Sequence, residues 1–397
     1  MSLPHTIIKH LRHLSHPLFL GIFVVVLVSL GSLLFASHQT NTSLTSENNS
    51  YKAQLASTNE ELNTLKARDE YKINEELKKE VDNIQQTYNL AVTTYEDLLA
   101  FQESHDDNDN IPDLEKGLAQ ALTYLSEKNY SSASALLISI GNTIESESQT
   151  VAESFSIPTN VAVNNAPPSS GSQRQQVQTE IGNYLVDIVS ADLGSTRVIV
   201  DTASDGTCTN DCPVLSLGDY VSRNSAFAGI NGSYFCPASY PSCQGKTNSF
   251  DTLLMNKNKT YFNSDNNVYS TVPVVVFGNG WIRFIGRSLD WGRATDVDGV
   301  IANQPLLVSG GNVVFGGDGD PKKGSKGSRS FVADKANTIY IGVIHNVTVE
   351  EAAIVLKTLG MENALNLDSG GSTALWSGGY KVGPGRNIPN AILFIRK

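Results

Sequence analysis

Residues 344–376, IHNVTVEEAAIVLKTLGMENALNLDSGGSTALW, decide how the last part of the chain folds. Thr348 stands three residues before Glu351, the spacing of a reciprocal capping box, so a helix is predicted to begin there. Gly360 is placed to end that helix. Between them, apolar residues recur every three to four positions and predict one buried face: Ala352, Ala353, Val355, Leu356 and Leu359.

The helix is followed by an acidic, glycine-rich turn. Residues 364–367 predict a short strand that runs into DSGGS at residues 368–372. Adjacent glycines, Gly370 and Gly371, let backbone N–H groups approach a bound anion, with Ser372 closing the turn and Asp368 at its edge. The alternative is a tight connection between strands, in which Asp368 bonds neighbouring amides.

Composition bounds the kind of protein. The chain has 397 residues, a formal net charge of −11 and a pI near 5.1, which argues against a nucleic-acid partner. Its length predicts two or three domains. Of its 32 glycines, five precede residue 177, so helices are expected in the first part and turn-rich β structure in the second.

The N-terminal region predicts a membrane anchor. Residues 17–36 form a 20-residue run without a charge, and the first 16 residues carry Lys9 and Arg12 but no acidic residue. We therefore expect residues 1–16 in the cytoplasm and the rest of the chain outside the cell membrane. A cleaved signal peptide is the alternative, although residues 34–38 lack a small-x-small cleavage site.

Residues 44–150 predict a helical stalk. Two runs alternate spacings of four and three, as a coiled-coil seam does: Leu44, Asn48, Tyr51, Leu55, Thr58, Leu62 and Leu65, then Leu77, Val81, Ile84, Tyr88, Ala91, Tyr95 and Leu98. A homodimer through this seam is one interpretation. A second amphipathic stretch, residues 114–140, predicts a hairpin that folds back on the first helix. Residues 151–176 are rich in Pro, Ser, Asn and Gln and indicate a linker.

Two acidic segments suggest divalent cations. The break at residues 105–113 resembles a calcium loop, but the turn glycine is absent and Lys116 stands where the closing Glu belongs. Its carboxylates at suitable spacing are Asp107, Asp109 and Asp113. A solvated loop between helices is the alternative. Asp318 and Asp320 are candidates of the same kind and are interpreted as solvated turn residues, so no cofactor is expected.

The four cysteines all lie in the last domain, at Cys208, Cys212, Cys236 and Cys243. Outside the cytoplasm an even count indicates disulfides, with three connectivities open. Local pairing of residues 208 with 212 and 236 with 243 is the simplest. A four-thiolate zinc site is the rival, but neither spacing is the usual one for a zinc ribbon.

Residues 177–397 predict an α+β domain with few helices and a mixed or antiparallel sheet. Predicted strands cover residues 184–190, 196–201, 272–277, 281–285, 306–308, 338–344 and 392–395. Helices are predicted at residues 349–359 and, more weakly, at 217–224.

Five blocks of this domain occur in the order of a known family: residues 228–235 (AGINGSYF), 302–308 (ANQPLLV), 328–331 (SRSF), 363–372 (NALNLDSGGS) and 386–391 (RNIPNA). With these blocks the domain resembles the phosphodiester glycosidases, a family that includes the lysosomal uncovering enzyme. The resemblance implies a hydrolase that cleaves sugar-1-phosphodiester linkages in surface glycoconjugates. Ser369 departs from the family pattern because relatives usually carry glycine there, and His345 and Asn346 stand where relatives often carry Asp-Gly-Arg.

The chemistry of that reaction suggests roles for particular residues. Cleavage at the anomeric carbon builds positive charge on the sugar while a phosphate monoester departs. Asp368 is the candidate catalytic carboxylate, as nucleophile or as base toward water. Arg329, taken as catalytic, and Arg386, taken as substrate-binding, are candidates for contacting phosphate because a guanidinium matches two of its oxygens. The resemblance implies substrate binding by Asn231 and Gly232. Each of these residues also has a structural alternative. Arg329 could be a surface cation, Arg386 could form an ion pair with a structural aspartate, and Asn231 could be a turn-forming residue.

Two other functions remain open. Residues 368–371 copy the nucleophile motif of chymotrypsin-type proteases, but His345 is the only histidine after His105 and the rest of a triad is missing. The other is a non-catalytic module on a coiled-coil stalk that binds a phosphorylated cell-wall polymer without cutting it. For the hydrolase and for the binding module alike, the expected partners are a phosphorylated glycan and, through the N-terminal helix, the membrane.

Overall fold

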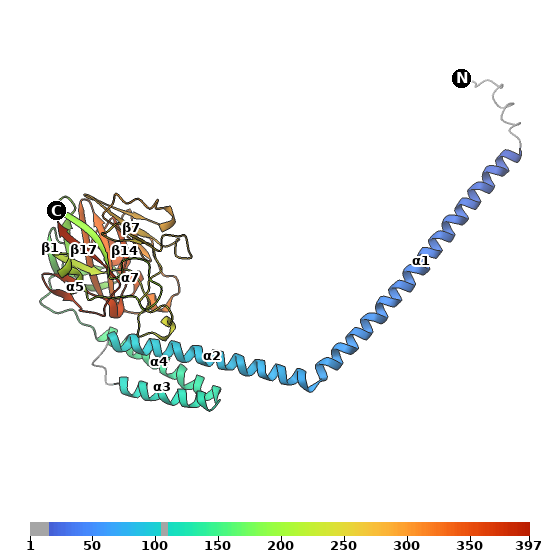
Figure 1. Cartoon of the computed structure of the whole chain (residues 1–397), viewed down its shortest axis with the longest axis horizontal. Coiled ribbons are helices and arrows are strands. Elements are labelled where there is room, and N and C mark those ends of the chain that lie inside the picture. The colour runs from blue at the N-terminus through green and yellow to red at the C-terminus, as the bar shows by residue number, and fades with distance from the viewer. Residues whose placement is uncertain (1–15, 105–109) are drawn as a thin grey trace, which may run out of the picture. The chain divides into compact units, whose positions relative to one another are not determined.

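The computed structural model describes residues 16–104 and 110–397 (Figure 1). Residues 1–15, most of the predicted cytoplasmic segment, and residues 105–109, which hold most of the predicted calcium loop, lie outside the described residues. The chain divides between Asn83 and Ile84 into two compact units, and the second contains every sheet.

The first unit contains the long helix α1 (His16–Ala67) and the beginning of α2 (Asp69–Ser104). From Gly21 onward α1 is long and apolar enough to cross a membrane, with a mean hydropathy of 2.1, and a signal sequence would satisfy the same criterion. Seam residues such as Leu55 and Leu62 are exposed. Pairing through this seam, as a coiled coil or homodimer, stays a prediction.

In the second unit, the C-terminal half of α2 packs with α3 (Ile111–Ser126) and α4 (Tyr130–Ser154). Their shared apolar cluster is Ala91, Leu98, Phe101, Leu114, Leu118, Ala121, Leu137, Ile140 and Ile144. The second amphipathic stretch therefore lies against the end of the first, in the arrangement that its spacing predicts. We call α2 from Ile84 onward, α3 and α4 the helical hairpin region.

Three antiparallel sheets form the rest of the second unit, from residue 171 to residue 397, which we call the head. The first has the order β1 (Gly171–Thr179), β2 (Gly182–Asp192), β13 (Thr338–Val347), β12 (Gly327–Lys335), β14 (Asn363–Asn366), β10 (Leu306–Ser309) and β11 (Asn312–Val313). The second runs β16 (Tyr380–Val382), β15 (Leu375–Ser377), β4 (Ala228–Asn231), β17 (Asn390–Arg396) and β3 (Thr196–Thr202). The third runs β6 (Tyr261–Phe262), β5 (Leu254–Met255), β9 (Gly299–Ala302), β7 (Val274–Gly278) and β8 (Trp281–Ile285).

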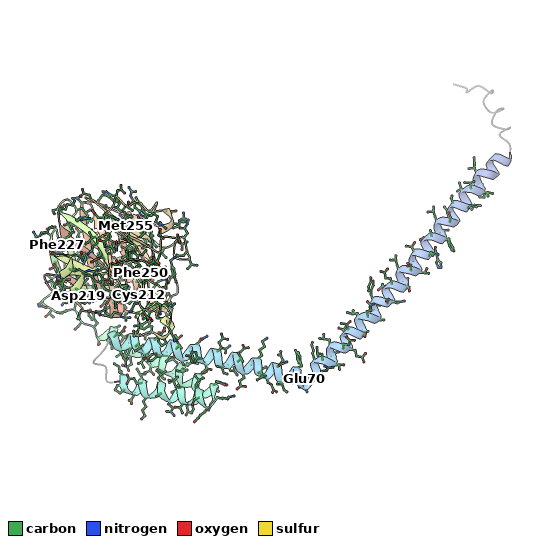
Figure 2. The ribbon with its side chains drawn as sticks, in the orientation of Figure 1. Glu70, Cys212, Asp219, Phe227, Phe250 and Met255 are labelled. Atoms are coloured by element: carbon green, nitrogen blue, oxygen red, sulfur yellow. A yellow bond between two sulfur atoms is a disulfide. The ribbon has the colours of Figure 1, made fainter. Side chains whose placement is uncertain are left out.

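All ladders between these strands are antiparallel, so of the two predicted kinds of sheet the antiparallel one forms. One central cluster joins residues of the three sheets, for example Ile341, Ile230 and Val275. Helix α7 (Val349–Thr358) packs on a second cluster formed by the other face of the first sheet, and α5 (Leu217–Arg223) belongs to a third cluster with the second sheet. Figure 2 places Phe250 and Met255, both buried, within the head.

The locally encoded features are confirmed. Thr348 Oγ1 accepts a hydrogen bond from Glu351 N at 3.1 Å, and Glu351 Oε2 accepts one from Thr348 N at 2.8 Å, which completes the capping box of α7. Both local disulfides are present, with Cα–Cα separations of 5.7 Å for Cys208–Cys212 and 5.3 Å for Cys236–Cys243.

Nine strands of the described residues were not predicted: β1, β4, β5, β6, β9, β11, β12, β15 and β16. β12 mixes glycine, serine and charged residues, and β4 is only four residues long, so neither shows a clear alternation. β1 is also polar and begins at Gly171, within the stretch predicted as a linker. Its partner β2 supplies the buried side chains that hold it to the sheet.

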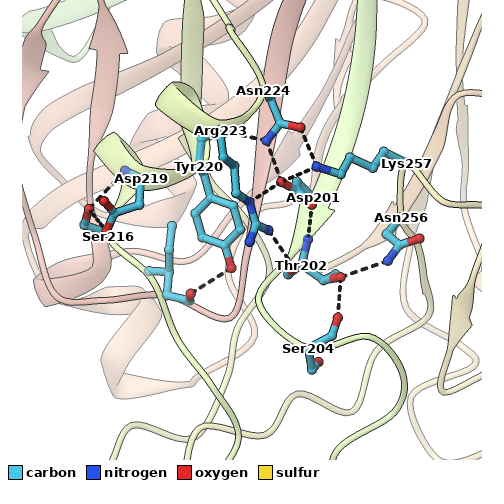
Figure 3. Close-up of polar contacts among 11 residues, drawn as sticks. Asp201, Thr202, Ser204, Ser216, Asp219, Tyr220, Arg223, Asn224, Asn256 and Lys257 are labelled. Atoms are coloured by element: carbon cyan, nitrogen blue, oxygen red, sulfur yellow. Dashed lines mark hydrogen bonds and ion pairs between the residues drawn. The ribbon is translucent and has the colours of Figure 1, made fainter.

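Asp201, near the end of β3, ties together several parts of the head (Figure 3). Its carboxylate accepts hydrogen bonds from Arg223 Nε at 2.7 Å, from Asn224 Nδ2, and from Lys257 Nζ at 3.1 Å. The residue is only 2% exposed. Burial by itself raises the pKa of Asp201, but the hydrogen bonds from Arg223 and Asn224 outweigh it and hold the pKa below 3.8.

We predict that Asp201→Asn lowers the free energy of unfolding by about 1 to 3 kcal/mol near neutral pH, because two cations lose their buried partner. Since the folded-state pKa is depressed, the stabilisation is present above 3.8 and disappears as the pH falls through the lower folded value. Unfolding measured at neutral and acidic pH checks both points.

The matched control is Asp290→Asn, which removes an exposed ion pair with Arg287 and should cost less than about 1 kcal/mol. Equal losses in the two variants would show that the buried cluster has no special role.

Candidate active site

The register between β12 and β14 brings two predicted catalytic residues to neighbouring positions. The last paired residues are Phe331 and Asn366, and a backbone hydrogen bond of 2.9 Å continues the ladder beyond them. Extending this register by two positions predicts that Arg329 faces Asp368, and the alternation of side chains along a strand then predicts both on the face that Phe331 shares with α7.

Asp368 is fixed by its backbone. Its N–H donates to Gly232 O at 2.9 Å, and its carbonyl accepts from Asn231 Nδ2 at 2.7 Å. The carboxylate Oδ1 accepts from Ser369 N at 2.9 Å. The acidic turn is therefore held by the end of β4 and the glycine that follows it.

The surroundings of Asp368 raise its pKa to about 6, chiefly through burial. Hydrogen bonds from Ser372 and Ser369 and the charge of Arg386 act in the opposite direction, and the charge of Glu103 adds to the increase. The carboxyl group thus changes its protonation state close to neutral pH, a property common among catalytic carboxylates.

Asn231 and Gly232 hold the acidic turn in place through hydrogen bonds to the backbone of Asp368. Asn231 is 0% exposed, and its Oδ1 accepts from Ser330 Oγ at 2.9 Å and from Ala374 N at 3.1 Å. A Cβ on Gly232 would overlap Asn390 Oδ1, so this close approach requires glycine. The contacts of both residues position Asp368, and direct binding of substrate by them stays a prediction.

A cyclic network of buried amides lies beside the turn, and the sequence did not reveal it. Tyr234 N donates to Asn303 Oδ1 at 3.0 Å, Asn303 Nδ2 to Asn366 O at 2.8 Å, and Asn366 Nδ2 to Tyr234 Oη at 2.6 Å. Both asparagines are 0% exposed. Tyr234 is therefore held rigidly beside the candidate catalytic pair.

Tyr234 links the two catalytic candidates electrostatically. Burial raises the pKa of its phenol, the charge of Asp368 raises it further and that of Arg329 opposes the increase. The phenol stays protonated and can donate a hydrogen bond. In the sequence, a tyrosine beside Phe235 gives no signal that separates this position from an ordinary core aromatic.

Arg329 is a buried cation whose hydrogen bonds, among the described residues, all go to backbone carbonyls. Its Nε donates to Val347 O at 3.2 Å and its Nη2 donates to Lys322 O and Ser325 O. Burial lowers the pKa of Arg329, with Tyr234 and Asp320 opposing the decrease. Within residues 16–104 and 110–397 no carboxylate forms an ion pair with Arg329. A buried cation of this kind is suited to an anionic ligand.

Arg386 lies on the glycine turn. The backbone N–H of Arg386 donates to Gly371 O at 2.7 Å, and its guanidinium carbon lies 5.5 Å from the centre of the Tyr240 ring. A Cβ on Gly371 would overlap the end of the Arg386 side chain, so a larger residue at this position would displace the guanidinium. The guanidinium also forms an ion pair with Glu103 of α2. Gly370, with φ of 64°, is the exposed corner of the same turn.

His345 belongs to a separate cluster. Its Nε2 lies 2.8 Å from Asp187 Oδ2 and its Nδ1 lies 3.4 Å from Ser328 Oγ. Ser369 Oγ instead donates to the carbonyl of Leu367 at 3.3 Å. The histidine contacts in the described part of the chain therefore give no support to a serine nucleophile at Ser369. A cavity of about 480 Å³ lies beside His345 and is lined by residues that include Asn346 and Lys326.

The metal candidates also find other partners. Asp318 and Asp320 both lie within ion-pair distance of Lys323. Among the described residues there is no group of three or more His, Cys, Asp or Glu side chains arranged to hold a metal ion.

The head is an α+β domain in which Asp368 and Arg386 lie at one glycine turn. Residues 224–395 match the phosphodiester glycosidase family. This match includes every predicted catalytic and substrate-binding residue and excludes the helical hairpin region. No curated protein matches the chain.

Several solved structures are similar. A hypothetical protein from Synechocystis is 16% identical, with a TM-score of 0.41 and coverage of 57% of this chain and 62% of that protein. The catalytic domain of zebrafish N-acetylglucosamine-1-phosphodiester alpha-N-acetylglucosaminidase, auto-inhibited by its pro-peptide, is 13% identical, with a TM-score of 0.42 and coverage of 60% and 87%. A putative exported protein from Burkholderia pseudomallei is 12% identical, with a TM-score of 0.34 and coverage of 54% and 74%.

We predict that Asp368→Asn raises the melting temperature near neutral pH by about 2 to 4 °C, because it removes a charge whose burial is unfavourable. A raised folded-state pKa means that stability is greatest in acid and falls as the pH rises from 3.8 through about 6. The advantage of the variant should therefore vanish near the acidic end of that range.

Thermal unfolding across this pH range is the measurement, with the exposed Asp251→Asn as control. A variant that is less stable than the wild type near neutral pH would show that the carboxylate holds the turn together.

Proposed function

We propose that the head hydrolyses sugar-1-phosphodiester linkages in surface glycoconjugates or glycopolymers. The observation that carries the proposal is that the charges of Asp368 and Arg329 both act on the phenol of Tyr234, inside the residues that match the phosphodiester glycosidase family. One residue supplies a carboxylate with a pKa near 6, and the other supplies a buried cation.

In the proposed reaction, the bond between the anomeric carbon and the phosphate oxygen breaks and its electron pair leaves with the phosphate monoester. Asp368 either attacks the anomeric carbon or takes a proton from the attacking water. Phosphate is a good leaving group, so strong protonation of the departing oxygen is not required. Arg329 and Arg386 stabilise the negative charge that develops on the phosphate.

Tyr234 and the glycine turn complete the proposed substrate contacts. The protonated phenol of Tyr234 donates a hydrogen bond toward the sugar or the phosphate, and the amides of Gly370, Gly371 and Ser372 contact phosphate oxygens. Asn231 and Gly232 contribute by holding Asp368 in place.

The apolar N-terminal helix and the two disulfides indicate passage through the secretory pathway. We propose that α1 remains as an uncleaved anchor and holds the head on the outer side of the cell membrane, where its glycan substrate would be found. A homodimer through the exposed seam of α1 and α2 is part of the same proposal.

We predict that the full chain in detergent releases free sugar from N-acetylglucosamine 1-(methyl phosphate) or a related glycosyl phosphodiester. Asp368→Asn should lower kcat by about 1,000-fold or more, and Arg329→Met by about 100-fold, because each removes charge stabilisation in the transition state. The wild-type rate should fall as the pH drops below about 6, since protonation inactivates the carboxylate.

Asp251→Asn, which changes an exposed carboxylate of the head, is the control and should keep the wild-type rate. Full activity in the Asp368→Asn variant would remove the proposed mechanism.

The second candidate is a module that binds a phosphorylated polymer without cleaving it. The serine at position 369, where the family usually has glycine, favours this alternative. Saturable binding of the glycosyl phosphodiester with no release of sugar by the wild-type chain would identify the module and exclude the enzyme.

A further inference from the structure

Helix α2 contacts three head loops that surround the candidate site. Glu96 Oε1 accepts a hydrogen bond from Ser242 N at 2.8 Å, in the disulfide-closed loop that carries Tyr240. Glu103 forms an ion pair with Arg386. Asp97 interacts electrostatically with Lys322 of α6 (Pro321–Gly324). The two cations among these partners, Lys322 and Arg386, each lie 5.5 Å from the centre of the Tyr240 ring.

The sequence of α2 explains why this face turns to the head. Glu96 and Glu103 are seven residues apart, so they lie on the same side of the helix. Leu98 and Phe101 occupy another side and are buried in the cluster with α3 and α4. Packing of the helical hairpin region thus fixes the rotation of α2, and with it the direction of its acidic side.

The Glu103 carboxylate lies where the proposed reaction needs a phosphate. A Cβ on Gly371 would lie 2.5 Å from Glu103 Oε2, so the carboxylate rests against the glycine turn as well as on Arg386. Like a phosphodiester, a carboxylate presents two oxygens and one negative charge to a guanidinium. The Nε of Arg386 is buried and has no hydrogen-bond partner among the residues that the structure describes, so this guanidinium retains a donor for another oxygen.

We propose that Gly371, Arg386 and Tyr240 form the phosphodiester subsite of the head, and that Glu103 of the helical hairpin region occupies it when no substrate is bound. The substrate phosphate must displace Glu103 before the sugar can approach Asp368. This inference rests on the proposed function for the identity of the ligand, while the occupancy of the subsite by a carboxylate rests on the contacts alone.

Displacement is feasible because the ion pair is only partly enclosed. The side chain of Glu103 is 28% exposed and that of Arg386 is 19% exposed. Partly exposed ion pairs are weak and are screened by salt. Glu103 therefore acts as an internal competitor that lowers the apparent affinity for phosphate, with no need for the head itself to rearrange.

The experiment measures phosphate binding and turnover in the full chain in detergent. Inorganic phosphate is titrated calorimetrically into the wild type, Glu103→Gln and Glu103→Ala, and KM and kcat are measured with the glycosyl phosphodiester. Both variants should bind phosphate about tenfold more tightly and lower KM by a similar factor, the change expected if the subsite is free about a tenth of the time in the wild type. Their kcat should stay unchanged.

The matched control is Glu115→Gln, which removes another carboxylate of the helical hairpin region, one that accepts a hydrogen bond from Gln102. It should leave phosphate affinity at the wild-type value. Unchanged or weaker phosphate binding in both Glu103 variants, or a fall in kcat without a change in phosphate affinity, would overturn the proposed occupancy.

The result also separates this inference from the proposed function. Tighter phosphate binding in the Glu103 variants without any turnover in any protein would support the subsite and reject the hydrolase. Turnover with no change in phosphate affinity would support the hydrolase and reject the role of Glu103.

Discussion

The antiparallel register of β12 and β14 is the constraint on which the candidate site depends. It is set by packing on both faces: Phe331 and Ala333 contribute to the cluster under α7, and Val332 to the central core. A slip of one residue would move every one of these side chains to the opposite face. Extended by two positions, the same register predicts Arg329 opposite Asp368, so the expected placement of the charged pair follows from burial of apolar residues in the same two strands.

Charged groups at this position need hydrogen-bonding polar neighbours, because burial of an ionised group is unfavourable without hydrogen bonds. The side chains of Asn231, Asn303 and Asn366 supply them, each joining strands or loops that are distant in the sequence. Burial still raises the pKa of Asp368 to about 6 and lowers that of Arg329. The fold therefore holds two candidate catalytic groups whose pKa values are shifted by burial, a pattern common in active sites.

The sequence predicted features that depend on neighbouring residues and missed those that depend on distant ones. The capping box at Thr348 and both disulfides involve spacings of a few residues, and all are confirmed. Asp368, Arg329 and Arg386 were identified because they lie in ordered blocks that resemble a family; Asp368 and Arg386 lie at the glycine turn, whereas the guanidinium of Arg329 contacts the carbonyls of Val347, Lys322 and Ser325. Whether they act as predicted is a matter for measurement.

Other site residues had no local signal. Tyr234 lies in the AGINGSYF block at residues 228–235, but its contact with Asn366 depends on the approach of the segment after β4 to β14. Glu103 lies outside the family match, on a helix whose regular spacing predicts only a stalk. Its position at Gly371 follows from how the helical hairpin region packs, and no spacing within the sequence encodes that approach.

The most direct test of the central claim is a crystal structure of the Asp368→Asn variant with an uncleaved glycosyl phosphodiester. The account predicts the phosphate on Arg386 and the glycine turn, with Glu103 displaced and the anomeric carbon facing residue 368 within reach of Arg329. A ligand bound elsewhere on the head, or residues 329 and 368 facing separate surfaces with no ligand between them, would contradict it.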